Sequence, residues 1–358
     1  MNQTTPRLLI AASGTGGHLF PALAVAEQLP EYAIEWLGVP DRLETGLVPD
    51  QYLLHTIAIE GFQSRPGLKT IKILTRQLGA VLTVKKLLQE KQIDVLFTTG
   101  GYIAGPSILA ARWLNIPVIL HESNSIPGKV TRFLSRFCDV VALGFAEAAQ
   151  YLPGVNTKWV STPVREQFRS PQELDLPVPP SAFLIVVVGG SQGAIALNDL
   201  IRTSAPRWFD TGAYIVHLTG EKDPNRGALK HPQYIELPFY ENMAGLFQRA
   251  DLAVSRSGSG TLTELAITGT PSILIPYPFA AEDHQFYNAQ AFAKGGAAYL
   301  YRQNEITSQQ LGELVKELIA SPGTLQTMRE KTENLAVKDS AGRLADLIRS
   351  FPSRKSQR

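Results

Sequence analysis

A single histidine stands in a glycine-rich turn near the start of the chain. His18 follows Gly14, Gly16 and Gly17 in SGTGGHLFP, between a short apolar run and a helical pattern that has Pro21 in its first turn. A helix start of this kind offers free backbone N–H groups to an anion, and it disfavours a protonated imidazole. His18 is therefore a candidate general base. The alternative is a hydrogen-bond donor to phosphate or backbone that closes the turn.

The turn lacks the established nucleotide-binding fingerprints. G-x-G-x-x-G would require glycine at position 19, which is Leu19, and Glu35 lies inside the next strand pattern instead of at its end. The sequence also contains no G-x-x-x-x-G-K-[ST]. Dinucleotide binding of the NAD type is therefore not indicated, and P-loop nucleotide hydrolysis is excluded at the level of motifs.

A second turn of the same form is GGSQGA, residues 189–194, where Ser191 and Gln192 add side-chain donors. Tight packing of a strand against a helix would explain one such glycine turn. Two matching turns in the two halves of the chain favour a ligand bound between those halves.

The segment SRSGSGTLTEL, residues 255–265, allows two interpretations. Thr261 and Glu264 have the S/T-x-x-E spacing of a capping box, in which the glutamate bonds back to the start of its helix. Alternatively, the carboxylate of Glu264 accepts the two hydroxyls of a ribose. Spacing alone does not separate these roles.

A fourth cluster, EDHQFYNAQ at 282–290, carries Asp283, His284, Gln285 and Asn288 on the first turns of a predicted helix. No second histidine follows at i+4, and no D-x-D occurs in the sequence, so a metal site is not expected. Amides and a histidine suit hydrogen bonds to a polar, uncharged ligand.

These clusters follow apolar runs that read as buried strands. The order strand, glycine turn, helix recurs at 7–29, 94–122, 183–204 and 251–278, which predicts parallel sheets built from βαβ units. Ligands of such sheets lie beyond the carboxyl ends of the strands. We expect an α/β chain of two doubly wound, Rossmann-like domains, joined by a Pro-rich linker with its hinge near residue 163.

Composition narrows the class of protein. The formal net charge is +2, which gives no reason to expect nucleic acid as a partner. Cys138 is the single cysteine, so we expect a core thiol and a reducing compartment. No apolar run reaches the roughly 18 residues of a spanning helix, and we expect a soluble or peripheral protein.

One segment suits a lipid surface. Residues 65–92 place apolar side chains at helical spacing beside basic ones, as in amphipathic helices that lie on anionic lipid. The apolar positions are Leu68, Ile71, Leu74, Leu78, Val81 and Leu82, and the basic ones are Arg65, Lys69, Lys72, Arg76, Lys85, Lys86 and Lys91. An ordinary crossover helix with a solvated basic face is the alternative.

Six motifs in order carry a family resemblance: GTGGHLFPALAVAEQL, GGYIAGPSILAA, HESNSIPG, GGSQGA, SRSGSGTLTEL and DHQFYNAQAFAKGGAA. From about residue 7 to about residue 345, the chain resembles the MurG family of N-acetylglucosaminyltransferases in bacterial peptidoglycan synthesis. Ser123 stands where the family usually has glutamine, and residues 42–69 are only loosely similar.

The resemblance implies a GT-B fold, in which two Rossmann-like domains face each other across a cleft and a last helix, here 340–351, crosses back to the first domain. The implied domains are 1–162 with 340–358 for acceptor and membrane, and 163–339 for UDP-GlcNAc. The implied reaction moves GlcNAc from UDP-GlcNAc to the C4 hydroxyl of MurNAc in lipid I, with inversion. It implies no cofactor and no metal. It implies a peripheral enzyme on the cytoplasmic face of the bacterial inner membrane, with other cell-wall synthesis proteins as possible partners.

The resemblance also implies roles for individual residues. Glu264 would take the ribose hydroxyls, Tyr240 would lie beside the uracil, and His284 and Gln285 would lie at the GlcNAc hydroxyls. Thr261 would also bind the substrate. The residues implied at the diphosphate are Ser191, Gln192 and Arg165. Those implied on the acceptor side are Thr15, Gly16, Gly17, His18, Tyr102, Glu122 and Asn124, with Asn124 also reaching the donor sugar. Glu122 is the rival of His18 as general base.

Two other functions remain open at this stage. A UDP-GlcNAc 2-epimerase of the same fold would need carboxylates at the sugar, where this chain has amides and a histidine. A UDP-sugar-binding subunit without catalysis would bind the donor and release no UDP when an acceptor is added.

Overall fold

The computed structural model describes residues 5–59, 68–190 and 194–352, and the chain forms two compact units. Unit 1 comprises Met1–Arg165 and Asp339–Arg358, and unit 2 comprises Glu166–Lys338. The sequence predicts that the chain passes from one unit to the other after residues 162 and 339. In the structure it does so after residues 165 and 338. Each unit has its own sheet and its own core.

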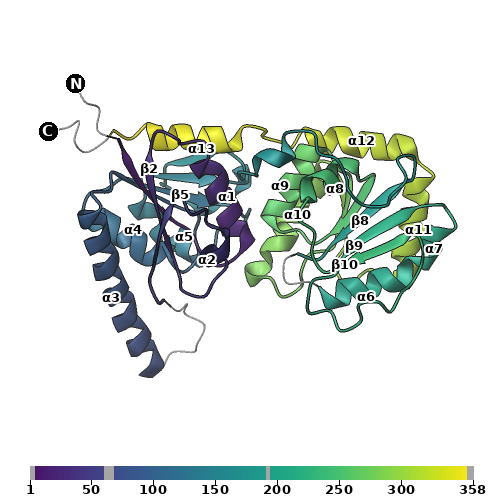
Figure 1. Ribbon diagram of the computed structural model, residues 1–358, viewed down its shortest axis with the longest axis horizontal. Coiled ribbons are helices and arrows are strands. Elements are labelled where there is room, and N and C mark those ends of the chain that lie inside the picture. Colours follow the sequence, from purple (N-terminus) through teal and green to yellow (C-terminus); the bar gives the residue numbers. More distant parts are fainter. Residues whose placement is uncertain (1–4, 60–67, 191–193, 353–358) are drawn as a thin grey trace. The chain divides into compact units, whose positions relative to one another are not determined.

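Unit 1 is built on a sheet of seven strands, and all their pairings are parallel (Figure 1). The strand order is β3-β2-β1-β4-β5-β6-β7. Its strands are β1 (Arg7–Ala11), β2 (Ala33–Gly38), β3 (Leu53–Thr56), β4 (Val95–Thr98), β5 (Val118–Glu122), β6 (Val140–Leu143) and β7 (Thr157–Trp159). The central strands are buried along their length because helices cover both faces, which explains why they read as continuous apolar runs.

The helices of unit 1 are α1 (Gly16–Ala26), α2 (Glu44–Leu47), α3 (Leu68–Glu90), α4 (Ala104–Trp113), α5 (Lys129–Leu134) and α13 (Ser340–Arg349), with the 3₁₀ helices η1 (Ser135–Phe137) and η2 (Ala146–Tyr151). One face of the sheet packs on α3 and α4 through Val84 and Ile108. The other packs on α1 and α13 through Val25 and Leu344. A sheet covered in this way is doubly wound, as predicted.

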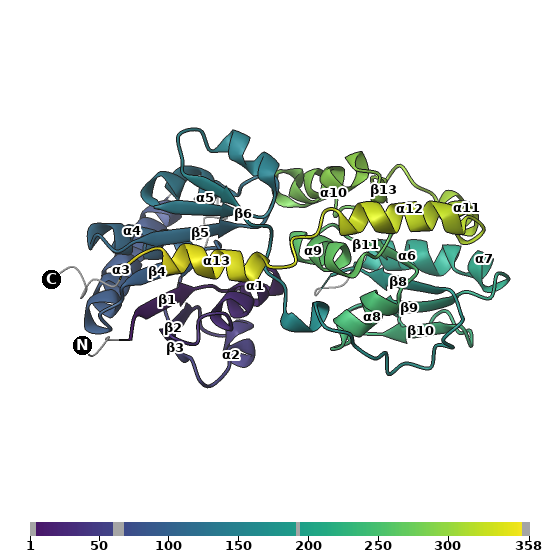
Figure 2. The same ribbon diagram turned by 90° about the horizontal axis from the view of Figure 1, so that it is seen from above.

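The last helix of the chain belongs to unit 1, although unit 2 precedes it in the sequence. α13 lies against α1 (Figure 2) and places Leu344, Ala345 and Ile348 in the core beside β1. Arg349 fixes its end, because the guanidinium donates to the carboxylate of Glu31 at 2.7 Å and to the Gln28 carbonyl at 2.6 Å.

Unit 2 has a six-stranded sheet, also parallel throughout, in the order β10-β9-β8-β11-β12-β13. Its strands are β8 (Leu184–Val188), β9 (Tyr214–Leu218), β10 (Tyr234–Leu237), β11 (Leu252–Ser255), β12 (Ser272–Leu274) and β13 (Ala298–Leu300). Its helices are α6 (Ile195–Ser204), α7 (Pro206–Phe209), α8 (Met243–Arg249), α9 (Ser259–Thr268), α10 (His284–Lys294), α11 (Ser308–Ile319) and α12 (Pro322–Glu333), with η3 (Glu166–Phe168) and η4 (Ala281–Asp283). The α/β, doubly wound class is confirmed for this unit too.

Each sheet changes its winding direction between two neighbouring strands. In unit 1 the chain runs outward from β1 to β3 and then returns to β4 on the other side of β1. In unit 2 it runs outward from β8 to β10 and returns to β11 on the other side of β8. Ligands of doubly wound sheets bind at this switch point, beyond the carboxyl ends of the strands. The residues that follow β1, β4, β8 and β11 are thus the first to examine for chemistry.

Two local expectations are wrong. Pro21 lies in the second turn of α1, where its missing N–H removes the helical partner of the Gly17 carbonyl. Thr261 does not start a helix, because α9 begins at Ser259 after Gly258 as N-cap. A residue inside a helix has helical backbone angles and cannot serve as the cap, so the capping-box interpretation of Thr261 and Glu264 fails.

Candidate active site

His18 lies at the switch point of unit 1, in the first turn of α1. Its Nδ1 is 2.7 Å from the carbonyl oxygen of Thr99, the residue that follows β4. Gly100 and Gly101 continue that turn with φ of +93° and +76°, a backbone region that favours glycine, and their backbone passes beside the imidazole ring. The two glycine turns after β1 and β4 therefore enclose one half-buried imidazole.

The contact with Thr99 fixes the tautomer of His18. A carbonyl oxygen only accepts, so Nδ1 carries the hydrogen and Nε2 keeps its lone pair. Burial lowers the pKa of His18 below 6.5, although the bond to Thr99 and the charge of Glu122 oppose this in part. The imidazole thus closes the turn as a backbone donor through one nitrogen and can accept a proton through the other.

The start of α1 is open. Thr15 is the N-cap, its side chain makes no capping bond, and Thr15 and Gly17 are exposed. The N–H groups of Gly16 and Gly17 therefore have no helical acceptor and can bind an anion. A side chain at position 16 would collide with the ring of Phe20, since a Cβ there would lie 2.7 Å from Phe20 Cε2.

A buried carboxylate that sequence reasoning missed supports this turn. Glu44 is fully buried, and its two oxygens accept the N–H groups of Gly14 at 3.1 Å and Val39 at 2.7 Å. Gly38 leaves room for it, because a Cβ there would lie 2.7 Å from Glu44 Cγ. Glu44 falls in the segment that is only loosely similar to the family motifs, so no motif could have indicated it.

Glu122 ends β5 near His18, and both of its carboxylate oxygens are engaged. One oxygen accepts the N–H and the side-chain amide of Asn124 at 3.0 and 3.2 Å. The other accepts the N–H of Gly128 at 3.0 Å and the hydroxyl of Thr131 at 2.6 Å. Because Gly128 is the N-cap of α5, Glu122 joins β5 to the start of this helix.

Two further predicted residues belong to unit 1. Tyr102 follows the Gly100–Gly101 turn and is 46% exposed, so its ring is open to a ligand. The guanidinium of Arg165 lies over the Phe20 ring, 4.5 Å from its centre, and Phe20 belongs to α1. Tyr102 and Arg165 thus both lie beside elements of the unit 1 switch point.

In unit 2 the predicted ribose residue Glu264 and its neighbour Thr261 lie on the helix that follows β11. Thr261 and Glu264 are half-buried on α9, behind the open N-terminus formed by Gly258. Ser191 and Gln192, in the turn after β8, lie outside the described residues. Glu264 is not part of a capping box, and it remains a candidate for the ribose hydroxyls.

Gln285 has a fixed amide orientation. Its Oε1 accepts the backbone N–H groups of Tyr277 at 2.9 Å and Ser257 at 3.3 Å, and its own carbonyl accepts the Ser257 hydroxyl at 2.8 Å. The oxygen of the amide is thus used inside the protein, which directs the NH₂ group the other way. Gln285 offers hydrogen-bond donors to a ligand.

His284 begins α10 after two residues with positive φ, Glu282 at +53° and Asp283 at +56°. Arg302 holds this strained turn through an ion pair of 2.7 Å with Asp283. The Nδ1 of His284 donates to the Ala281 carbonyl at 2.8 Å, which leaves Nε2 as an acceptor. His284 and Gln285 thus offer one acceptor and a donor pair from adjacent positions.

Tyr240 is held by a side chain of its own unit. Its hydroxyl donates to the carboxylate of Asp175, and burial and that carboxylate raise its pKa to about 12. The preceding residue, Phe239, is 65% exposed and is the more open aromatic ring of the pair. Sequence reasoning chose Tyr240, and the exposed ring of Phe239 is a further candidate beside it.

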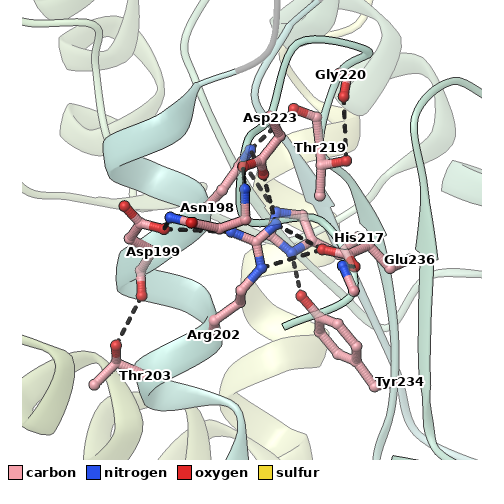
Figure 3. Close-up of polar contacts among 12 residues, drawn as sticks. Asn198, Asp199, Arg202, Thr203, His217, Thr219, Gly220, Asp223, Tyr234 and Glu236 are labelled. Carbon is pink, nitrogen blue, oxygen red and sulfur yellow. Dashed lines mark hydrogen bonds and ion pairs between the residues drawn. The ribbon is translucent and has the colours of Figure 1, made fainter. Parts of the chain in front are cut away.

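A buried ionic network lies under α6 (Figure 3). Arg202 bonds Asp223 at 2.5 Å and Glu236 at 2.6 Å, and all three side chains are at most 8% exposed. Asn198 donates to Asp223 and to the Thr219 carbonyl. Its amide oxygen therefore accepts from Nε2 of His217. Burial lowers the pKa of His217 to about 3, so the ring is neutral and its Nδ1 accepts the Tyr234 hydroxyl. The network fixes α6 to β9 and β10.

Three neighbouring helices of unit 1 expose apolar side chains. Leu78 and Leu82 of α3 are 60% and 49% exposed, and Trp113 of α4 is 56% exposed. Lys85 lies over the Trp113 ring at 3.7 Å. Phe133 of α5 is also exposed. At the described end of the stripe predicted for residues 65–92, Leu78 and Leu82 are open to solvent, whereas Val81 is buried in the core of unit 1. The side chains of residues 60–76 lie outside the described part.

The described part of the chain has neither a cluster of metal-ligating side chains nor a membrane-spanning helix. In residues 5–59, 68–190 and 194–352, no three His, Cys, Asp or Glu side chains gather as metal ligands would. Among the helices of this described part, none is long and apolar enough to cross a bilayer.

Both halves of the chain match domains of a known glycosyltransferase family. Residues 8–143 match the N-terminal domain of glycosyltransferase family 28, and residues 184–344 match its C-terminal domain. The UDP-N-acetylglucosamine–N-acetylmuramyl-(pentapeptide) pyrophosphoryl-undecaprenol N-acetylglucosamine transferase of Microcystis aeruginosa is 68% identical over 358 residues, which cover 100% of this chain and 99% of that protein. The protein of the same name from Synechocystis sp. is 60% identical over 344 residues, 96% of this chain and 97% of that protein.

A solved structure agrees with these relatives. The crystal structure of Acinetobacter baumannii MurG superposes with a TM-score of 0.77 at 31% sequence identity, covering 96% of this chain and 99% of that one. The GT-B fold expected from the motifs is thus confirmed, and the chain belongs to the MurG enzymes of glycosyltransferase family 28.

Proposed function

We propose that this chain transfers N-acetylglucosamine from UDP-GlcNAc to the C4 hydroxyl of the MurNAc unit of lipid I, giving lipid II and UDP with inversion. The reaction is the one for which its near full-length relatives are named. The observation that carries the chemistry is the neutral His18, which keeps a free Nε2 at the open start of α1.

In this mechanism the acceptor oxygen attacks C1 of GlcNAc from the face opposite UDP. The C1–O bond to the diphosphate breaks, UDP leaves with the electron pair, and the hydroxyl proton passes to His18 Nε2. A neutral imidazole is needed for the last step, and both burial and the helix start favour that form.

Glu122 suits a positioning role better than that of the base. Its two oxygens already accept four hydrogen bonds, from Asn124, Gly128 and Thr131. All four bonds come from donors of the protein, so the carboxylate serves to hold Asn124 and the start of α5. The same bonds orient Asn124, which we assign to the acceptor and to the donor sugar.

The donor is assigned to unit 2 by the chemistry of its open groups. Glu264 takes the ribose hydroxyls with Thr261 beside it, while His284 and Gln285 take the GlcNAc hydroxyls. Phe239 joins Tyr240 as a candidate to cover the uracil, because its ring is exposed. Helix N-termini and Arg165 stabilise the charge on the leaving diphosphate, together with Ser191 and Gln192.

One assay tests the function against its rivals. Purified protein is given UDP-GlcNAc with and without a lipid I analogue, and UDP release and the disaccharide product are measured. The transferase releases UDP only with the acceptor. Epimerised or hydrolysed donor without acceptor would indicate the epimerase type, and donor binding without any turnover would indicate a binding subunit.

We also propose that α3 and α4 rest on the anionic inner face of the bacterial plasma membrane, where a lipid-linked acceptor would reside. The support is the exposure of Leu78, Leu82 and Trp113 next to Lys85. An ordinary helix with a solvated face is the alternative.

Vesicle binding tests this surface. We expect Leu78→Ser with Leu82→Ser to weaken binding to phosphatidylglycerol vesicles at least tenfold, since each buried leucine contributes roughly 1.5–3 kcal/mol. Lys85→Glu with Lys86→Glu should weaken it as well. The control reverses two exposed charges of unit 2, Lys230→Glu with Lys316→Glu, and should change little. Unchanged binding of the leucine variant would refute the site.

A further inference from the structure

Arg256 is a buried arginine directly after β11, and its guanidinium joins three loops of unit 2. Nη1 donates to the carbonyls of Ile275 and Pro276, both at 2.9 Å, just beyond β12. Nη2 donates to Oε1 of Gln303, beyond β13, at 2.6 Å. The backbone N–H of Arg256 bonds the Val188 carbonyl at 3.1 Å, which places the residue at the switch point beside β8.

The charge of Arg256 is held by neutral oxygens. Arg256 is 5% exposed, no carboxylate of the described residues forms an ion pair with it, and its Nε has no hydrogen-bond partner among them. Burial lowers its pKa to about 10. Burying a cation without a counter-ion destabilises the fold, so we expect a role that requires a guanidinium at this position.

That role follows from one peptide group. The Pro276 carbonyl, which accepts from Arg256, and the Tyr277 N–H, which donates to Gln285 Oε1, belong to the same trans peptide. The two bonds point in opposite directions from one rigid plane. Arg256 therefore aims the Tyr277 N–H at Gln285, and its positive charge polarises the peptide so that this N–H is a stronger donor.

The second donor to Gln285 is built in the same way. The peptide between Arg256 and Ser257 gives its N–H to Gln285 Oε1, while its carbonyl accepts the hydroxyl of Ser255 at 2.9 Å. Both N–H groups that fix the amide oxygen thus come from peptides held on their carbonyl side. Arg256 takes part in each of them.

We propose that Arg256 is a positioning residue for the donor sugar: through the Pro276–Tyr277 peptide it orients the side-chain amide of Gln285 so that its NH₂ group faces the sugar of the nucleotide donor. The proposal rests on the proposed function, in which Gln285 contacts GlcNAc. It assigns to Arg256 no contact with the nucleotide itself.

A double-mutant cycle tests this. Affinities for UDP-GlcNAc and for UDP are measured by calorimetry for the full chain, for Arg256→Met, for Gln285→Ala and for the double variant. We expect each single variant to bind UDP-GlcNAc about tenfold more weakly, as for one lost hydrogen-bonded contact, and UDP less than threefold more weakly. The double variant should be no weaker than Gln285→Ala, because Arg256 acts through Gln285.

Arg256→Lys keeps the charge but cannot span both carbonyls and Gln303, so it should recover part of the selectivity lost in Arg256→Met. If Arg256→Met does not fold, Arg256→Lys replaces it in the test. An equal loss of affinity for UDP-GlcNAc and for UDP in Arg256→Lys would then overturn the proposal. Losses that multiply in the double variant, or equal losses for the two ligands, would overturn it too. Failure of the wild-type protein to transfer GlcNAc would contradict the proposed function. An additive double-mutant cycle in an active enzyme would contradict only the role of Arg256.

Discussion

At the scale of single residues, backbone carbonyls decide the proton positions of the histidines in the site. Thr99 accepts from Nδ1 of His18, and Ala281 accepts from Nδ1 of His284. The buried His121 donates from Nε2 to the Ser161 carbonyl at 3.1 Å. In His18 and His121, whose pKa values burial lowers, the other nitrogen keeps its lone pair, and neither ring needs a neighbouring acid to hold its tautomer.

Loss of His18 should remove the base and leave the fold intact. We expect His18→Ala to lower kcat by roughly 100-fold or more, the usual range for a general base. His55→Ala is the matched control, because this β3 histidine pairs with Glu35 of β2 and makes no contact with the turn after β1 among the described residues. A near-normal kcat with a raised KM for the acceptor would assign His18 to binding.

The pH profile should report the same group. Protonation of His18 occupies Nε2, so kcat/KM should fall tenfold per pH unit below the pKa of His18 in the free enzyme. Since burial lowers that pKa, the acid limb should lie below pH 6.5. A limb above pH 6.5 would contradict a buried neutral imidazole. The residual rate of His18→Ala should show no such limb.

At the scale of elements, the site is a set of turns at helix starts, each held by a side chain from elsewhere. Glu44 holds the turn before α1, Glu122 holds the start of α5, and Arg256 holds the loop after β12. Of these turns, the start of α1 is exposed and offers the N–H groups of Gly16 and Gly17. Buried charged side chains behind the turns fix the conformation of the turns.

Glu122→Gln separates positioning from base catalysis. Its NH₂ group would face donors at Gly128 or Asn124, which should destabilise unit 1 by about 1–3 kcal/mol and loosen α5. Thr131→Val removes one of the same bonds and should lower stability less. Both are followed by urea unfolding and kcat. An unchanged stability with activity at background and no acid limb would instead make Glu122 the base.

The strand, turn and helix order was predictable because each strand is a local apolar run and each turn a glycine cluster. The contacts behind the turns were not. Glu44 meets Gly14 across 30 positions, and Arg256 meets Pro276 through a carbonyl that any residue would supply. The cap of α9 was misplaced for a related reason: Thr261 has the right spacing, yet the backbone turns into the helix at Gly258.

At the scale of the whole molecule, each unit carries buried neutral histidines. Burial lowers the pKa of His121 in unit 1 to about 4 and that of His217 in unit 2 to about 3. The unfolded chain binds a proton at these histidines below about pH 6.5, and the folded units do not until the pH is far lower. The folded form is therefore favoured above pH 6.5 and loses ground as the pH falls.

Acid should destabilise both units through these buried histidines. We expect the free energy of unfolding to fall by roughly 1 kcal/mol per pH unit for each histidine between about pH 6 and 4.5. Asp223 and Glu31, whose pKa values are lowered, contribute only at lower pH. His217→Gln should flatten this slope in unit 2 and leave unit 1 unchanged, as followed by urea unfolding. A slope that stays the same in the variant would disprove the assignment.

The return of α13 to unit 1 bears on how the molecule is made. During synthesis β1 emerges early, but the face of its sheet that Leu344, Ala345 and Ile348 cover must wait until all of unit 2 has been translated. Unit 2 is continuous in the sequence and can fold on its own schedule, whereas unit 1 keeps an apolar seam open in the meantime. The first half of the nascent chain therefore exposes this apolar seam until α13 has been made.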